Sequence, residues 1–290
     1  IEFDAVFRDA RVWVNGFFLG QHPSGYTGVQ YALTDYLNYD GDNVISVRAD
    51  ASMEEGWFYE GAGINRHVRL LKTHPLHVKP WGTAVTTDLA ADHTQTTVRI
   101  VTELNHTGRT TLSASLEHTV LGPDGQPVAS TRVDSRPIAP GDEPVIPASL
   151  TIEAPALWST TTPRLYTAVT TLRGNDGIEL DRYVTSFGIR SVRFDPNEGF
   201  FLNGEPLKIK GVNLHHDHAG VGAALPDALH EFRLRRLQAF GVNAIRTAHR
   251  LPPPEVLDAC DRLGLLVLDE NRLMGTNAAQ LTELRDMIRR

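Results

Sequence analysis

Three stretches follow one another closely in this chain of 290 residues: Val242-Asn-Ala-Ile-Arg-Thr-Ala-His249, then Glu255-Val-Leu-Asp-Ala-Cys-Asp-Arg-Leu263, then Leu265-Leu-Val-Leu268. The first stretch opens with a short strand-like run, and the last is continuously apolar, which predicts a strand buried on both faces. The middle segment repeats apolar residues at helical spacing, and Gly264 suits the position after its end. Its predicted apolar face comprises Val256, Cys260 and Leu263. A strand, a helix and a strand with short connections predict parallel pairing.

The same alternation extends in both directions along the chain. Residues 207–212 predict an earlier strand, residues 227–240 an earlier helix, and a last helix begins near Ala278. The predicted apolar face of the 227–240 helix comprises Leu229, Phe232, Leu237 and Phe240, interrupted by Arg233 and Arg236. No glycine-rich phosphate loop follows any strand, which favours the start of a (β/α)₈ TIM barrel over a doubly wound sheet. Three strands leave such a barrel incomplete, so the remainder is expected after residue 290.

Polar residues gather just past each predicted strand. They are Asn213, His215 and His216 after the first, Arg246 and His249 after the second, and Asp269 and Glu270 after the third. The carboxyl ends of parallel strands form the active face of a (β/α)₈ barrel. These seven residues are therefore the candidate substrate-binding set.

Two of these groups admit more than one chemistry. The residues of the run His215-His216-Asp217-His218 are of types that bind metal ions. Side chains of neighbouring residues diverge after a strand, however, which argues against a metal site. The alternatives are hydrogen bonding to sugar hydroxyls and a plain surface loop. Asp269 and Glu270 are adjacent, and adjacent side chains at a strand end point to opposite sides. They therefore make a poor ~5 Å pair for acid/base work about one bond. One of them is expected to orient an arginine or a histidine instead.

The first part of the chain is all-β in pattern. Asn15-Gly16 between residues 11–14 and 17–19 predicts a hairpin with a type I′ turn, and residues 43–48 and 67–71 alternate as half-buried strands do. The aromatic loop Trp57-Phe-Tyr59 suits either sugar stacking or core packing.

A second β region follows at residues 76–190. Residues 94–105 and 110–118 are predicted to pair as a hairpin, and Pro123-Asp-Gly125 marks a further turn. Strands at this spacing, with turn residues between them, predict an immunoglobulin-like sandwich.

The composition excludes several classes of protein. Twenty-eight basic against thirty-five acidic residues give a formal charge of −7, which argues against a nucleic-acid surface. No apolar stretch reaches the ~18 residues of a membrane helix. The single Cys260 cannot form an internal disulfide, which fits a reducing compartment. A cytoplasmic location and a periplasmic or secreted one both stay open. The chain opens at Ile1 in strand-like sequence and closes at Arg290 in helical sequence, so we expect a fragment of a longer protein.

Several motifs, in this order and spacing, resemble the family 2 glycoside hydrolases. They are Val12-Trp-Val-Asn-Gly16, Gly25-Tyr26, Gly61-Ala-Gly-Ile-Asn-Arg-His-Val68, Phe201-Leu-Asn-Gly-Glu-Pro206, Lys210-Gly-Val-Asn-Leu-His-His-Asp-His218, Asn243-Ala-Ile-Arg-Thr-Ala-His249 and Asp269-Glu-Asn271. The resemblance implies a multidomain β plus α/β architecture. Residues 1–75 would be the second half of a jelly-roll sandwich, residues 76–190 an immunoglobulin-like sandwich, and residues 195–290 the first part of the catalytic barrel.

The resemblance also implies roles for the candidate residues. His215 and His249, with Asn213 and His216 beside them, would hold the scissile sugar, and Arg246 would brace a nucleophilic carboxylate. Asp269 and Glu270 would support them from behind. The family's two catalytic glutamates would lie beyond residue 290, so no residue of this chain is expected to be catalytic.

Magnesium is possible, but the sequence does not support it, because Met274 and Thr276 stand where the resemblance places a glutamate and a histidine in magnesium-dependent relatives. Sodium likewise has no support in the sequence, and no cofactor is required.

The sequence thus predicts part of a retaining β-glycosidase, with a β-galactoside as the expected substrate. A weak preference for galactosidases comes from Pro75-Leu-His-Val-Lys-Pro-Trp-Gly-Thr83. The alternatives are a β-glucuronidase or β-mannosidase of the same family, or a carbohydrate-binding module without catalysis. The chain alone is expected to be inactive. Its oligomeric state and compartment stay open.

Overall fold

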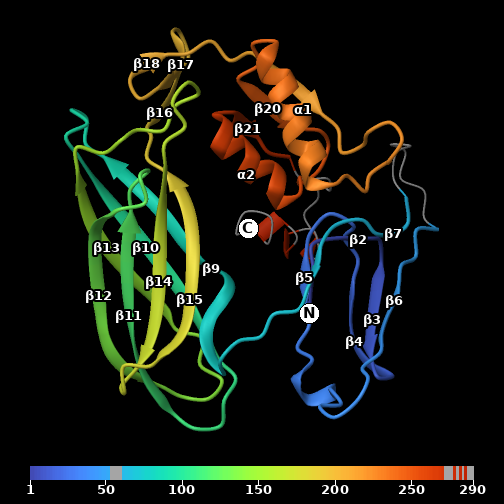
Figure 1. Ribbon diagram of the computed structural model, residues 1–290. Coiled ribbons are helices and arrows are strands. Elements are labelled where there is room, and N and C mark those ends of the chain that lie inside the picture. Colours follow the sequence, from blue (N-terminus) through green and yellow to red (C-terminus); the bar gives the residue numbers. More distant parts are fainter. Residues whose placement is uncertain (53–60, 271–276, 279–280, 283, 286–290) are drawn as a thin grey trace. The chain divides into compact units, whose positions relative to one another are not determined.

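The computed structural model describes residues 1–290 except 53–60, 271–276, 279–280, 283 and 286–290. It divides into two compact units (Figure 1). The first unit joins Ile1–Leu71 with Lys210–Cys260 and Leu265–Arg290, and the second comprises Lys72–Ile209 with Asp261–Gly264. Each unit is described by itself.

The N-terminal part of the first unit contains small antiparallel sheets. The bounds of its elements are β1 (Glu2–Phe3), β2 (Val6–Phe7), β3 (Ala10–Val14), β4 (Phe17–His22), β5 (Val29–Gln30), the 3₁₀ helix η1 (Thr34–Tyr36), β6 (Ile45–Arg48), β7 (Gly63–Ile64) and β8 (Val68–Arg69). They pair in the orders β5-β1-β8, β2-β7 and β4-β3-β6. The predicted hairpin is confirmed, since Asn15 and Gly16 have φ of 49° and 85° between β3 and β4. The aromatic loop Trp57–Tyr59 lies outside the described residues.

The C-terminal part of the same unit has the predicted parallel sheet. Its elements are β19 (Gly211–Leu214), α1 (Asp227–Ala239), β20 (Ala244–Thr247), α2 (Pro254–Leu263) and β21 (Leu266–Leu268). The strand order is β19-β20-β21 and both pairings are parallel. The predicted face of α2 is confirmed, because Val256 and Cys260 are 3% and 0% exposed, and Gly264 follows with φ of 79°. Of the last helix, Ala278 and residues 281, 282, 284 and 285 are described as helical.

Two predictions about burial in this region are wrong. Of the predicted apolar face, Phe232 in α1 and Phe240 directly after it are 52% and 88% exposed, whereas His230 and Leu234 are buried. The inward face is partly polar because His230 stacks on His216 and the neighbouring Arg233 has an inward hydrogen bond, contacts that an apolar pattern does not reveal. Leu268 was expected to be buried on both faces but is 50% exposed, because no described strand pairs with β21 on its outer side.

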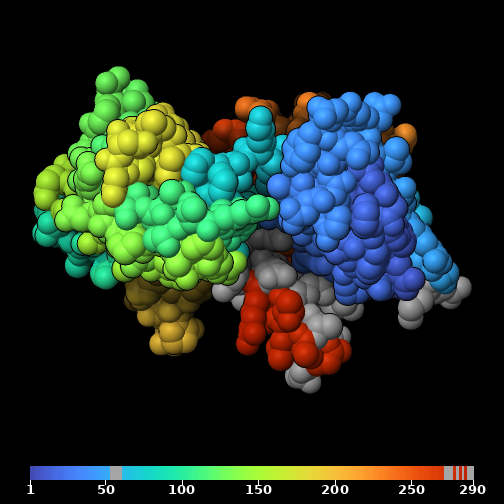
Figure 2. Space-filling model, turned by 90° about the horizontal axis from the view of Figure 1, so that it is seen from below, coloured from blue at the N-terminus to red at the C-terminus, as the bar shows by residue number. Residues whose placement is uncertain are grey.

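The second unit is a sandwich of two antiparallel sheets. One has the order β13-β10-β9 and the other β12-β11-β14-β15. The strands are β9 (Leu76–Leu89), β10 (Gln95–His106), β11 (Leu112–Leu121), β12 (Pro127–Ile138), β13 (Val145–Glu153), β14 (Leu165–Gly174) and β15 (Glu179–Gly188). Two clusters of fully buried apolar residues fill the space between the sheets, one around Ile100 and Val120 and the other around Leu104 and Leu172. In Figure 2 the sandwich is coloured from cyan at β9 through green to yellow at β15.

The hairpin predicted for residues 94–118 is wrong. β10 pairs with β9 and β13, and β11 pairs with β12 and β14, so the connection at residues 107–111 passes from one sheet to the other. Both strands alternate buried and exposed side chains, and this alternation is the same whether two strands pair or face each other across a core. The turn at Gly125 is confirmed between β11 and β12, with φ of 79°.

A small antiparallel sheet that the sequence did not predict completes the second unit. It is formed by β16 (Val192–Asp195), β17 (Gly199–Leu202) and β18 (Glu205–Pro206). The Leu207 N–H donates to the carbonyl of Phe200, so the predicted strand at 207–212 begins four residues later, at Gly211. Among the described residues, no helix combines the length and the apolar character that crossing a membrane requires.

Candidate functional site

The carboxyl ends of β19, β20 and β21 bring four of the candidate residues into contact. Asn213 and Arg246 are register partners on neighbouring parallel strands, and Arg246 Nη1 lies 3.4 Å from Asn213 Oδ1. The other terminal nitrogen of Arg246, Nη2, forms an ion pair of 2.6 Å with Glu270 Oε2. It also lies 3.4 Å from His249 Nδ1. Arg246 therefore links the ends of all three strands.

Glu270 is the centre of this group. Its Oε1 lies 2.8 Å from His249 Nδ1, while its Oε2 takes the ion pair with Arg246. Its side chain is 18% exposed and that of His249 24% exposed, so both are partly screened from water. The carboxylate accepts a hydrogen bond from His249 Nδ1, which fixes the orientation of the imidazole ring. The prediction that one of the two acidic residues orients an arginine or a histidine is confirmed.

Asp269 holds the backbone that carries Glu270. Asp269 Oδ1 accepts from the Thr247 hydroxyl at 2.7 Å and from the Glu270 N–H at 2.9 Å. The Glu270 N–H also lies 3.1 Å from Thr247 Oγ1. Thr247 is buried at the end of β20. The sequence analysis did not include it, although a hydroxyl at the end of a strand, next to a strand that ends in a candidate acid, could have indicated it.

His215 joins the group through its ring. The imidazoles of His215 and His249 meet edge to face, with centroids 5.5 Å apart and planes at 83°. The main chain of His215 is held from behind, because Arg233 Nη2 of α1 donates to its carbonyl at 2.9 Å. His215, Arg246, His249 and Glu270 thus form one constellation, which we call the strand-end cluster.

His216 lies elsewhere. It is 8% exposed and stacks on His230 of α1, with centroids 5.5 Å apart and planes at 30°. Burial, together with the nearby charges of Arg66 and Arg250, lowers the pKa of His216 to about 2, and burial lowers that of His230 to about 4. Both rings are therefore neutral at physiological pH. The structure does not bring His216 into the strand-end cluster with which the sequence grouped it.

The metal alternative for the run 215–218 gains no support from the described residues. Among the described residues, the side chains whose ligand atoms lie within 4.8 Å of one another are instead His67, Asp227 and Glu255. The sequence did not single out these three. His67 Nε2 lies 2.9 and 3.1 Å from the two oxygens of Asp227. Glu255 Oε1 is 2.9 Å from Arg69 Nη2, so this trio already forms an ion-pair network.

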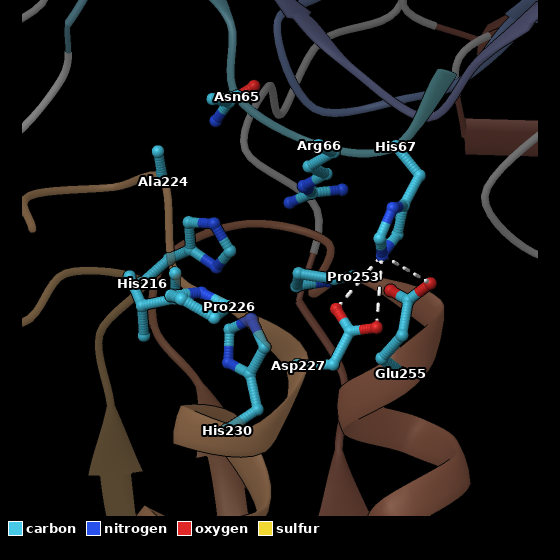
Figure 3. Close-up of a pocket in the computed structure, with 11 residues that line it drawn as sticks. Asn65, Arg66, His67, His216, Ala224, Pro226, Asp227, His230, Pro253 and Glu255 are labelled. Atoms are coloured by element: carbon cyan, nitrogen blue, oxygen red, sulfur yellow. Dashed lines mark hydrogen bonds and ion pairs between the residues drawn. The ribbon is translucent and has the colours of Figure 1, made fainter. Parts of the chain in front are cut away.

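A pocket of about 360 Å³ lies beside this network (Figure 3). Asn65 and Arg66 enter it from the segment before β8, His216 from the loop after β19, and Asp227 and His230 from α1. Arg66 donates to the backbone carbonyls of Tyr26 at 3.1 Å and Leu251 at 2.8 Å, and burial lowers its pKa to about 10.

The arrangement of the strand-end cluster suits hydrogen bonding to a polar ligand better than proton transfer. Glu270 is engaged on both oxygens, so it is a poor nucleophile or acid, and it fixes Arg246 and His249 as charge-assisted hydrogen-bonding groups. Asn213 adds an exposed amide at the same edge. Such a set hydrogen-bonds hydroxyl-rich ligands and can brace another carboxylate.

Comparison with known proteins shows the family of this chain. Residues 76–190 match the family model of glycosyl hydrolases family 2, and residues 195–288 match the model of that family's TIM barrel domain. The beta-galactosidase BoGH2A of Bacteroides ovatus is 42% identical over 271 residues, which is 93% of this chain and 32% of that protein. The chain belongs to glycosyl hydrolases family 2, and the predicted fold class of sandwiches followed by an incomplete barrel is confirmed.

Two solved structures have the same fold over nearly the whole chain. A glycosyl hydrolase family 2 member from Bacteroides cellulosilyticus superposes with a TM-score of 0.91 at 33% identity, covering 99% of this chain and 38% of that one. The beta-glucuronidase 2 of Bacteroides uniformis, covalently bound to cyclophellitol-6-carboxylate aziridine, gives 0.91 at 28% identity, covering 99% and 36%. The chain spans about a third of the length of these proteins.

Proposed function

We propose that this chain is the central part of a retaining β-galactosidase and forms one wall of the subsite that holds the terminal galactose. The observation that supports the proposal most directly is the strand-end cluster, in which Glu270 fixes both Arg246 and His249 at the carboxyl edge of parallel strands. Family 2 membership gives the class of reaction, and the 42% identity to a Bacteroides ovatus protein named as a beta-galactosidase favours this substrate.

In the proposed mechanism, the chain binds and orients the sugar. His215 and His249 donate to or accept from its hydroxyls, and hydrogen bonds of this kind that strengthen in the transition state lower the barrel enzyme's activation barrier. Arg246, held by Glu270, presents its guanidinium to the attacking carboxylate and keeps that group ionised. The two carboxylates that cleave the bond by double displacement are proposed to come from barrel sequence after residue 290.

The test is hydrolysis of chromogenic β-galactoside, β-glucuronide and β-mannoside by the full-length protein and by the 290-residue chain. We expect the full-length protein to cleave the β-galactoside and the chain alone to cleave none of the three. Preference for the β-glucuronide would overturn the substrate assignment but leave the reaction class intact, an outcome that the Bacteroides uniformis relative makes specific. Hydrolysis by the chain alone would overturn the placement of the catalytic carboxylates.

A β-glucuronidase needs a cation to bind the carboxylate of its substrate. In the strand-end cluster Arg246 is already paired with Glu270 at 2.6 Å, so the cluster's cation is engaged. Because Arg246 is assigned to the attacking carboxylate, recognition of a uronic acid would require a cation from outside the strand-end cluster.

A further inference from the structure

Two motifs of the N-terminal β part, Gly25-Tyr26 and Gly61-Ala-Gly-Ile-Asn-Arg-His-Val68, contribute no residue to the strand-end cluster. Arg66 of the second motif lies on the segment that leads into β8 (Figure 3). This segment belongs to the same compact unit as the loop 248–253, which follows β20 and carries His249. A contact between the segment and the loop therefore connects the motifs with the candidate site.

The guanidinium of Arg66 makes such a contact. Its Nη1 donates to the carbonyl of Tyr26 at 3.1 Å, and its Nη2 donates to the carbonyl of Leu251 at 2.8 Å. Leu251 lies two residues after His249, whose imidazole is hydrogen-bonded to Glu270. Hydrogen bonds with a charged donor are roughly twice as strong as those between neutral groups. Arg66 therefore fixes the backbone of the loop close to His249.

A second contact joins the loop to the same part of the molecule. Arg250 of the loop lies over the ring of Tyr26, with its guanidinium carbon 4.9 Å from the ring centroid, and both residues are buried. Tyr26 in turn packs against Phe7. The ring of Phe7 leaves no room for a side chain at Gly25, since a Cβ there would lie 2.3 Å from it. The Gly25-Tyr26 motif thus forms a surface that the loop contacts.

The loop needs contacts of this kind to keep its shape. None of the residues 248–253 lies in a helix or a strand, and Pro252 and Pro253 have no N–H to donate. Binding residues on loops are positioned by the scaffold around them. The position of His249 is therefore expected to depend on the two contacts with the N-terminal β part.

The charge of Arg66 argues against a role in stability alone. Burial and the nearby charge of Arg250 lower the pKa of Arg66 to about 10, and the carboxylates of Asp4 and Glu255 offset this only in part. The hydrogen bonds of its guanidinium go to backbone carbonyls. Removing a positive charge from water without a close counter-ion costs stability. An arginine in this setting suits the positioning of a backbone segment better than the stabilisation of the fold.

We propose that Arg66 is a positioning residue for His249. It holds the loop after β20 against the segment before β8, and Arg250 on the ring of Tyr26 gives the loop its second contact. The imidazole of His249 then stays where the carboxylate of Glu270 accepts from its Nδ1. This role deepens the proposed function and rests on it for the sugar that His249 binds.

The experiment is a double-mutant cycle in the full-length protein, measured with whichever chromogenic glycoside the parent hydrolyses. Arg66→Met removes the donors and keeps a long side chain. It should lower kcat/KM about 10–100-fold, mainly through kcat, as a displacement of about 1 Å in a substrate-positioning group does. In the His249→Ala background the same change should lower kcat/KM less than about twofold, because the residue that Arg66 positions is gone. Arg66→Lys keeps a charged donor and should recover part of the loss.

The matched control is Arg69→Met. Arg69 lies three residues further along the same segment and pairs with Asp4 and with Glu255 of α2, so it also joins the β part to the barrel segment. These partners lie outside the loop 248–253. Arg69→Met should lower the unfolding temperature and leave kcat/KM at the parental value. If Arg66 acted on stability alone, Arg66→Met would behave in the same way.

Crystal structures distinguish failure of this proposal from failure of the proposed function. In Arg66→Met the loop should shift and the contact of 2.8 Å between His249 Nδ1 and Glu270 Oε1 should lengthen. An unchanged loop and contact, or full additivity in the cycle, would overturn the positioning role. Parental hydrolysis by His249→Ala would instead refute the proposed function, and the crystal structure would still decide the role of Arg66.

A second variant covers the case in which Arg66→Met does not fold. Tyr26→Leu removes the ring under Arg250 and leaves the carbonyl that Arg66 binds. It should lower kcat/KM about threefold in the parent and leave it unchanged in the His249→Ala background. Equal losses in both backgrounds would count against the loop as the link to His249.

Discussion

The immunoglobulin-like sandwich and the parallel sheet of the barrel use their residues in opposite ways. In the sandwich, Ile100, Leu104 and Leu172 are fully buried and the strands alternate cleanly between core and solvent. In the barrel segment, Leu268 of β21 is half exposed, and His230 and Arg233 of α1 point inward. Polar groups meet at the strand ends. The sandwich buries an apolar core between its sheets, whereas the barrel segment gathers polar and charged side chains at its strand ends.

The comparison predicts a difference in acid sensitivity, which is the largest effect we expect. His118 is buried in the sandwich and burial lowers its pKa to about 4, while the barrel segment has both His216, with a pKa of about 2, and His230, with about 4. Each folded pKa lies below the unfolded value of about 6.5, so the unfolded chain binds more protons between the two values. Stability is therefore complete above pH 6.5 and is lost as the pH falls towards 4.

The expected loss is on the order of 3 kcal/mol for His118 and larger for the two barrel histidines together. Calorimetry of the full-length protein between pH 7 and 4 should show the barrel transition moving further than that of the sandwich. His118→Gln should flatten the pH dependence of the sandwich alone. Equal shifts of both transitions would contradict the contrast between the two regions.

Truncating matched leucines tests the packing side of the comparison. Leu172→Ala empties a fully buried position between the sheets and should cost about 2–5 kcal/mol of unfolding free energy. Leu268→Ala, at a position that is 50% exposed, should cost under about 1 kcal/mol. The pair is measured by denaturant unfolding. A cost at Leu268 as large as at Leu172 would mean that β21 is covered in the full-length protein.

Glu270→Gln tests the functional side. The substitution keeps the volume but removes the charge that holds Arg246 at 2.6 Å and His249 at 2.8 Å, so kcat/KM for the β-galactoside should fall about 100-fold in the full-length protein. The matched control is Glu231→Gln on α1, whose carboxylate pairs with Arg235 on the helix surface. That variant should retain parental activity. Parental kinetics in Glu270→Gln would remove the cluster from the mechanism.

The smallest effect is expected on the outer face of α1. Phe232 is 52% exposed, so Phe232→Ser should change the unfolding free energy by under about 0.5 kcal/mol. His230→Leu on the inner face of the same helix should cost more, since it removes the stack on His216. If Phe232→Ser were the more damaging change, the apolar face inferred from sequence would be the packed one in the full-length protein.

Much of the fold could be predicted from local sequence patterns. Asn15-Gly16 specified its turn because both residues tolerate positive φ, and the Val256/Cys260 spacing specified the buried face of α2. The strand ends marked Arg246, His249 and Glu270 as neighbours, because parallel strands present their carboxyl ends at one edge. The predicted hairpin of residues 94–118 failed because the periodicity was ambiguous. The strands β10 and β11 alternate buried and exposed side chains as hairpin strands do, but they lie in different sheets.

By itself the sequence determined the alternation of strands and helices in the barrel segment, the family and all four members of the strand-end cluster, since these depend on spacing along the chain. Only the tertiary structure decided that His216 leaves that cluster for a stack on His230, that Thr247 fixes Glu270, and that Arg66 and Asn65 meet His216 across one pocket. Those contacts join residues up to about 150 positions apart in sequence. Their energies depend on burial and donor geometry, which the folded chain sets and no local pattern encodes.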